Sequence, residues 1–153
     1  MDRQAIEKRV RRACKSLVQR DRLLLKLDVN ERSITHKLAE YLRVEFPRWH
    51  VDCEYNRIGS EPIEPKRLQL AVNQISSDDD QGKTVYPDVI VHRRSNTQRN
   101  LLVIEVKKST NPEPRNHDKR KLKAYTSQLG YRYAVSLEIQ TRVQHPKILF
   151  RFM

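Results

Sequence analysis

Apolar residues recur every three to four positions along the first third of the chain, which predicts two amphipathic helices. In residues 2–27 the apolar positions are Ile6, Val10, Ala13, Leu17, Val18 and Leu23 to Leu25. In the segment that follows they are Ile34, Leu38, Tyr41 and Leu42. We expect Asp28 or Asn30 to cap the second helix and Pro47 to end it. Glu31 would support its first turn in the manner of a capping box.

The pattern changes further along the chain to short apolar or alternating stretches, which are typical of strands. Strands are expected at 49–57, 84–92, 100–108, 131–139 and 147–152. Before the fourth of these, Leu122, Tyr125 and Leu129 form a helix face, and Gly130 is its natural C-terminal cap. The order is two helices, three strands, a helix and two strands, without an internal repeat. It predicts one mixed α/β domain over residues 1–153, with a central sheet.

Residues 58–83 are expected to form an insertion or hairpin arm within this domain. The segment opens with two prolines and closes on an acidic, glycine-containing turn. Its acidic triplet, Asp78–Asp80, could in principle hold a cation. Three consecutive carboxylates cannot all face one ion, so a solvated turn is the better interpretation.

The net charge of the chain indicates which kind of molecule it would bind. The chain has 31 Lys and Arg residues against 19 Asp and Glu, a formal net charge of +12. Such a charge on a small domain is self-repelling, and a polyanion relieves the repulsion. Nucleic acid is the leading candidate, and a basic protein without such a partner is the alternative. Residues 1–27 form a basic N-terminal helix, whose stripe is a solvated face or a phosphate contact. The stripe consists of Lys8, Arg11, Arg12 and Lys15.

The cellular compartment of the protein is predicted from its cysteines and from the hydropathy of the chain. Cys14 and Cys53 lie far apart and form no metal-binding spacing, so we expect both to be reduced and buried. No stretch is long and apolar enough to cross a membrane, and the N-terminus lacks a signal-peptide core. We therefore expect a cytoplasmic protein.

Three charged residues, Asp88, Glu105 and Lys107, lie in or beside the two most apolar strands. Because strand side chains alternate, Glu105 and Lys107 share a face, about 7 Å apart. A hairpin turn near residues 95–100 would make the strands antiparallel and bring Asp88 beside both. A buried, unpaired carboxylate costs several kcal/mol, so Glu105 needs a cation. Lys107 or a hard divalent metal ion would serve, and a plain ion-pair cluster at a sheet edge is the alternative.

Glu31 is a fourth candidate. It precedes Ile34 by three residues and Leu38 by seven, so it lies on the core-facing side of its helix. An acid in a first helical turn also interacts favourably with the helix dipole, so capping alone is the alternative to a role in the site.

These residues resemble a known motif. Pro87-Asp88, followed by Glu105-Val106-Lys107 on the next strand, is similar to the motif of the PD-(D/E)XK nuclease superfamily, which has the restriction-endonuclease-like fold. The α-β-β-β-α-β order resembles that family's core, and Glu31 matches an acid that many members carry on the preceding helix. The resemblance covers roughly residues 28–138.

The resemblance implies a Mg²⁺-dependent or Mn²⁺-dependent endonuclease that hydrolyses DNA in restriction, repair, recombination or defence against mobile elements. Asp88, Glu105 and the backbone carbonyl of Val106 would hold the metal ion. Lys107 would orient the attacking water, and Glu31 would complete the coordination directly or through water. The alternative is a nucleic-acid-binding subunit that is not catalytic or needs a partner. A homodimer would suit double-strand cutting.

Further nucleic-acid contacts are expected at Arg57, Arg93 and Lys121. Asp118 lies four residues before Leu122 and should point from its helix toward the sheet. His92 is about 13 Å along the strand from Asp88, too far to share its ion.

Overall fold

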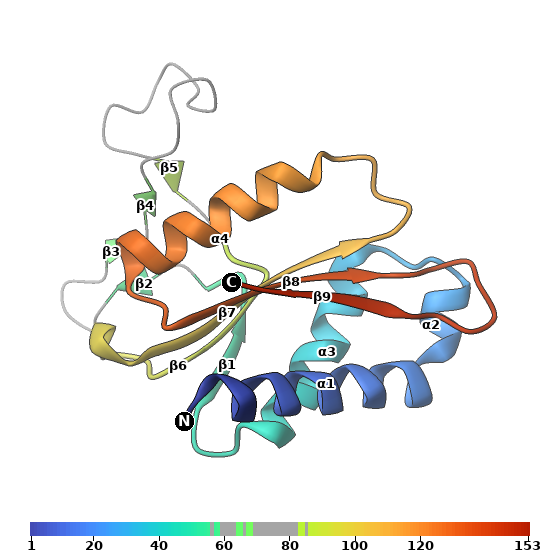
Figure 1. Cartoon of the computed structure of the whole chain (residues 1–153), viewed down its shortest axis with the longest axis horizontal. Coiled ribbons are helices and arrows are strands. Elements are labelled where there is room, and N and C mark those ends of the chain that lie inside the picture. The colour runs from blue at the N-terminus through green and yellow to red at the C-terminus, as the bar shows by residue number, and fades with distance from the viewer. Residues whose placement is uncertain (56, 59–63, 66, 69–82, 85) are drawn as a thin grey trace.

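The structure of the chain is a computed structural model that describes residues 1–55, 57–58, 64–65, 67–68, 83–84 and 86–153. Its central element is a five-stranded mixed sheet with the strand order β1-β6-β7-β8-β9 (Figure 1). The strands are β1 His50–Cys53, β6 Val89–His92, β7 Asn100–Lys108, β8 Tyr133–Ile139 and β9 Ile148–Phe152. All neighbours pair antiparallel except β7 and β8, which are parallel. The fold is therefore α/β with an open sheet.

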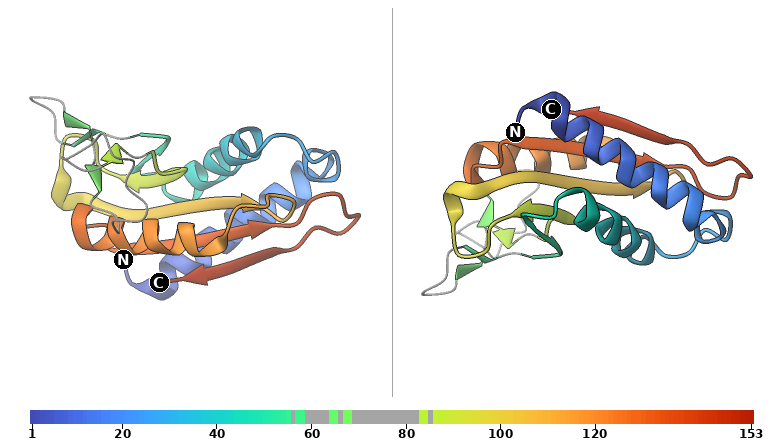
Figure 2. Two further views of the ribbon diagram at one scale, coloured as in Figure 1. Left: turned by 90° about the horizontal axis from the view of Figure 1, so that it is seen from above. Right: turned by 90° about the horizontal axis from the view of Figure 1, so that it is seen from below.

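Helices cover both faces of this sheet (Figure 2). They are α1 Arg3–Arg20, α2 Arg22–Lys26, α3 Glu31–Glu45 and α4 Arg115–Leu129. α1 and α3 pack on one face, where their apolar stripes meet side chains such as Leu102, Ile104 and Val135. α4 packs on the other face, where Leu122 and Tyr125 are buried with residues from the sheet. Both faces of β7 are consequently covered, which explains its continuous run of apolar residues.

The single helix expected over residues 2–27 is wrong, because the structure divides it into α1 and α2. Asp21 leaves the helical conformation, with φ −120° and ψ 30°. Its carboxylate accepts a hydrogen bond from the Tyr41 hydroxyl of α3. This tertiary contact ties the break to the neighbouring helix, which periodicity along one segment cannot reveal.

The expected caps divide into confirmed and corrected ones. Asn30 caps α3, since its side chain accepts a hydrogen bond from Ser33 N at 2.8 Å. Gly130 ends α4 in the left-handed region, with φ 69°. Glu31 makes no capping box, because its carboxylate bonds to β7 and the loop after it instead. Cys14 is buried as expected, whereas Cys53 is exposed on the edge strand β1.

The strand expected at 84–92 begins only at Val89 in the central sheet. Within the expected insertion, the described residues form two short pairs of strands. These are β2 Arg57–Ile58 with β3 Glu64–Pro65, and β4 Arg67–Leu68 with β5 Lys83–Thr84. The rest of the insertion, with the triplet Asp78–Asp80, lies outside the described residues. No described helix combines the length and apolarity needed to span a membrane.

The antiparallel hairpin expected between the two apolar strands is confirmed. Val89 of β6 pairs with Ile104 of β7, and the register shifts at a bulge beside His92. Asp88 immediately precedes β6, so the hairpin places it level with the residues that follow Ile104. The β8 strand continues to pair with β7 beyond this point. The end of β7 is therefore fixed on one side by β8 and open to side chains on the other.

Candidate functional site

Asp88 lies immediately before the first residue of β6. Its Oδ2 accepts a hydrogen bond from the backbone N of Val106 at 2.7 Å, so the carboxylate satisfies a β7 donor at the end of the hairpin. The pKa of Asp88 is raised to about 6, mainly by burial and to a smaller extent by the charges of Glu31 and Asp118. The Val106 hydrogen bond and Lys121 act in the opposite direction. Because the pKa stays above the ordinary value of 3.8, the Val106 hydrogen bond and Lys121 do not fully offset the cost of burying the Asp88 charge.

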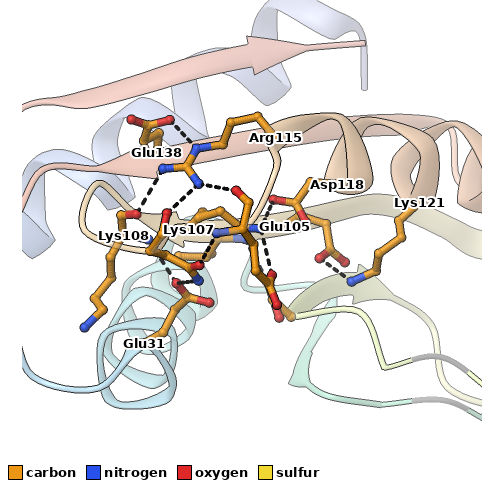
Figure 3. A network of polar contacts seen from close by, with 12 residues as sticks. Glu31, Glu105, Lys107, Lys108, Arg115, Asp118, Lys121 and Glu138 are labelled. Carbon is orange, nitrogen blue, oxygen red and sulfur yellow. Dashed lines mark hydrogen bonds and ion pairs between the residues drawn. The ribbon is translucent and has the colours of Figure 1, made fainter.

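Glu105 is more deeply buried, with only 2% of its surface exposed. Its Oε2 accepts a hydrogen bond from Lys121 Nζ at 2.6 Å (Figure 3). Burial, followed by the charge of Asp88, raises the pKa of Glu105 to about 8 despite Lys121. Its Oε1 is buried and makes no hydrogen bond of normal geometry with the described residues. Lys121 thus holds one oxygen of the carboxylate, and the Tyr125 hydroxyl is a further polar group that acts on Glu105.

The Tyr125 hydroxyl of α4 belongs to the same environment. It is buried and, within the described chain, also lacks a hydrogen bond of normal geometry. Burial, then the charges of Glu105 and Asp88, and a side-chain hydrogen bond with Glu105 raise the pKa of Tyr125. The periodicity of α4 predicts Tyr125 as a core residue, and its position beside Glu105 follows only from how α4 crosses β7.

Lys107 points along the same face of β7 but contacts other groups. Its Nζ lies 3.0 Å from Asp118 Oδ2 and 3.1 Å from Glu113 Oε2. Burial lowers its pKa, but the hydrogen bonds with Asp118 and Glu113 outweigh burial and raise the pKa overall. Asp118 is buried at the start of α4, as its spacing from Leu122 predicts. Glu113 lies in the loop before α4, where no periodic pattern could have indicated it.

Lys121, expected as a phosphate contact, lies 2.6 Å from the candidate carboxylate Glu105. Burial lowers the pKa of Lys121, but Glu105 and then Asp88 and Asp118 raise it overall. The site therefore alternates acids and lysines: Asp118 holds Lys107, and Glu105 holds Lys121 (Figure 3). Lys107 pairs with Asp118 and Glu113, and Lys121 pairs with Glu105. Asp88, in contrast to these three acids, has no lysine within ion-pair distance among the described residues.

Glu31 approaches from the opposite face of the sheet. Its Oε2 accepts hydrogen bonds from Lys108 N and Asn111 Nδ2, both at 3.0 Å. It also lines a pocket of about 300 Å³ with Asp88 and Glu54. The prediction that Glu31 lies on the core-facing side of its helix is therefore confirmed. Its carboxylate braces the end of β7 rather than meeting Glu105.

The acids at the end of the β6–β7 hairpin are candidate ligands for a metal ion. Among the described residues, no group of three or more His, Cys, Asp or Glu side chains is close enough to hold one. The charge of Asp88 nonetheless raises the proton affinity of Glu105, and Glu31 and Asp118 raise that of Asp88. Oxygen donors with excess negative charge suit a hard divalent cation. Two carboxylates fit such an ion, and the remaining ligands would be the Val106 carbonyl and water.

The other expected nucleic-acid contacts are dispersed. The stripe on α1 is exposed, as predicted, but it lies on the sheet face opposite Glu105. Within it, Arg11 lies over the Phe150 ring, 4.4 Å from its centroid, and Arg12 pairs with Glu45. Arg93 lies at the far end of β6, in a separate pocket. The side chain of Arg57 is outside the described part of the structure.

His92 is buried, and its Nε2 lies 2.7 Å from Asp52 Oδ2. It therefore belongs to a polar pair at the far end of β6, consistent with its predicted distance from Asp88.

Comparisons with protein-family models, with curated proteins and with solved structures found no match.

Proposed function

We propose that the chain is a metal-dependent nuclease that hydrolyses phosphodiester bonds in DNA, built on a restriction-endonuclease-like core. The observation that carries the proposal is the convergence of Asp88 and Glu105 at the end of the β6–β7 hairpin. Both are held in place, and both have a raised pKa, chiefly because burial disfavours their charges and because neighbouring acids add repulsion: Asp88 acts on Glu105, and Glu31 and Asp118 act on Asp88. Perturbed acids beside lysines are typical of catalytic sites.

The proposed metal ligands are Asp88, Glu105 and the Val106 carbonyl, with Glu31 contributing through water. A bound Mg²⁺ or Mn²⁺ supplies a water of lowered pKa and offsets charge on the phosphate. Asp88 positions Val106 through its hydrogen bond to the backbone N. Glu105 holds the ammonium of Lys121 within 2.6 Å, where it would meet a phosphate oxygen.

The role expected for Lys107 then needs one refinement. Asp118 and Glu113 hold its ammonium 3.0 and 3.1 Å away, while Lys121 is the lysine that contacts Glu105. We therefore assign phosphate contact to Lys121, and to Lys107 the orientation of the attacking water together with Asp118. Both lysines come from the α4 face of the sheet, so the substrate would approach there.

A second function, a nucleic-acid-binding subunit that does not cleave by itself, is favoured by one observation. The Glu105–Lys121 ion pair already satisfies half of the candidate carboxylate, and the described residues include no three-acid cluster. A partner chain or substrate would then have to rearrange this pair.

The test is cleavage of linear, circular, branched and single-stranded DNA, and of RNA, with Mg²⁺, Mn²⁺ or chelator. Asp88→Asn keeps the size of the side chain and removes its charge, and Glu138→Gln is the matched control on β8. Metal-dependent cleavage that Asp88→Asn abolishes and Glu138→Gln preserves supports the nuclease. Salt-sensitive DNA binding by the wild type without cleavage under any condition supports the second function.

A further inference from the structure

A second polar pocket, remote from the acids, is lined by four arginines. It has a volume of about 370 Å³. Its basic residues are Arg48, Arg93, Arg99 and Arg132, and the others are Trp49, Gln98, Asn100 and Leu101. No acidic residue is among the described residues that line it. Four guanidinium groups around one pocket repel each other unless an anion enters.

The fold, rather than one segment, gathers these arginines. They come from the α3–β1 connection, the β6–β7 connection and the α4–β8 connection. Backbone hydrogen bonds hold the connections together: Arg93 N donates to Arg99 O at 3.0 Å, and Arg132 N donates to Asn100 O at 3.1 Å. The Asn100 side chain also donates to Leu129 O at 2.7 Å. The arginines are therefore mounted on a braced end of the sheet.

Among the described residues, no salt bridge involves Arg48, Arg93, Arg99 or Arg132. The ion pairs that other arginines form in the described part of the chain are those of Arg3, Arg12, Arg32, Arg94, Arg115 and Arg142. Arg93 lies over the Trp49 ring, 5.5 Å from its centroid, and its Nε is buried without a hydrogen-bond partner among those residues. A guanidinium stacked on an indole is well suited to donate in-plane hydrogen bonds to phosphate oxygens.

The location separates this pocket from the acids. The β6–β7 connection lies at one end of the molecule in Figures 1 and 2, and β7 leads away from it toward Lys108. Asn100 and Glu105 are five residues apart along β7, or about 17 Å at the usual rise per residue. That separation corresponds to more than one phosphate spacing along a nucleic-acid strand, so one substrate could reach both places.

We propose that this arginine pocket binds a phosphate group of a nucleic-acid strand at a point away from the bond that is cut. The inference rests on the proposed function in that the same nucleic acid occupies both sites. The pocket would supply affinity and register, while Asp88 and Glu105 carry the chemistry. Phosphate contacts position a nucleic acid without reading its sequence, so the pocket would act equally on all sequences.

The test measures binding of a fluorescent 20-nucleotide single strand and its duplex in chelator, at several salt concentrations, so that cleavage plays no part. The variants are Arg93→Gln, Arg99→Gln and Arg132→Gln. Arg43→Gln, an exposed arginine on α3 outside the pocket, is the matched control. Each pocket variant should raise Kd by about 3-fold to 10-fold and reduce the salt slope by about 0.7 to 0.9.

Inorganic tripolyphosphate distinguishes a phosphate site from general charge. It should displace DNA from the wild type more readily than from the pocket variants. If Arg43→Gln weakens binding as much as the pocket variants do, the pocket contributes only net charge and the inference is wrong. Because binding is measured without metal, loss of affinity in the variants of a protein that never cleaves would refute the nuclease and leave the pocket standing. Cleavage by the wild type, together with unaltered DNA binding in all three pocket variants, would support the nuclease and refute the arginine pocket.

Discussion

Neutralising Glu105 should stabilise the protein at high pH. Its carboxyl group is almost fully buried, and burial together with Asp88 raises its pKa from an ordinary 4.5 to about 8. The folded protein then keeps a proton that the unfolded chain loses between those two pKa values. The stability of the wild type must therefore fall as the pH rises from about 4.5 to 8. Glu105→Gln removes this loss because glutamine does not ionise.

The magnitude follows from the size of the shift. For pKa values of about 4.5 unfolded and 8 folded, the wild type loses about 3 kcal/mol more at pH 9 than at pH 5.5. Glu105→Gln should thus gain on the order of 2–3 kcal/mol relative to the wild type between these pH values. The substitution also removes the negative charge that faces Lys121, which offsets part of the gain in stability. Asp88 and Asp118 are the other charges that act on Lys121.

Urea unfolding at both pH values, in chelator, measures this gain. Glu138→Gln on β8 is the control, because its half-exposed pair with Arg115 should contribute no more than about 1 kcal/mol. A structural ion pair predicts the opposite result. If Glu105→Gln destabilises the protein equally at pH 5.5 and pH 9, the Glu105–Lys121 contact holds the fold together and the reasoning for a strained functional carboxylate fails.

Four further predictions address the site and the fold. Cleavage with saturating Mg²⁺ should increase from pH 6 to pH 8.5 as Asp88 and Glu105 lose protons, and a flat pH profile would contradict their role as metal ligands. Lys121→Met should raise KM and lower kcat, because the proposed phosphate contact acts in binding and in the transition state; unchanged steady-state kinetics would remove it from the site. Added Mn²⁺ should raise the Tm of the wild type and leave that of Asp88→Asn nearly unchanged in a calorimetric scan, whereas equal shifts would place the ion elsewhere. Asn30→Ala should cost about 1 kcal/mol of unfolding free energy in urea titrations, through loss of the cap on Ser33 N.

Much of the candidate site could be predicted from local pattern. Side-chain alternation places Glu105 and Lys107 on one face of β7, and the polar turn predicts the antiparallel hairpin that brings Asp88 beside them. The structure confirms both. The spacing of Asp118 from Leu122 likewise predicts a side chain that points toward the sheet. These inferences depend only on periods of 2 and 3.6 residues, which short segments carry by themselves.

Contacts between elements could not be predicted in this way. Which lysine meets Glu105 depends on where α4 crosses β7, and the structure selects Lys121 over Lys107. Glu31 satisfies β7 rather than its own helix, because α3 begins beside the last residues of that strand. Asp21 breaks the first helix where α3 supplies Tyr41. Each choice is made by a partner distant in sequence.

The sequence by itself determined the α/β class, the order of the elements and the pair of acids on adjacent strands, since these follow from periodicity and turn residues. Only the tertiary structure decided the pairing of acids with lysines, the burial that raises the pKa values and the gathering of four arginines at the far end of the sheet. The physical reason is that hydrogen bonds, Coulomb interactions and desolvation act over a few ångströms in space, regardless of separation along the chain.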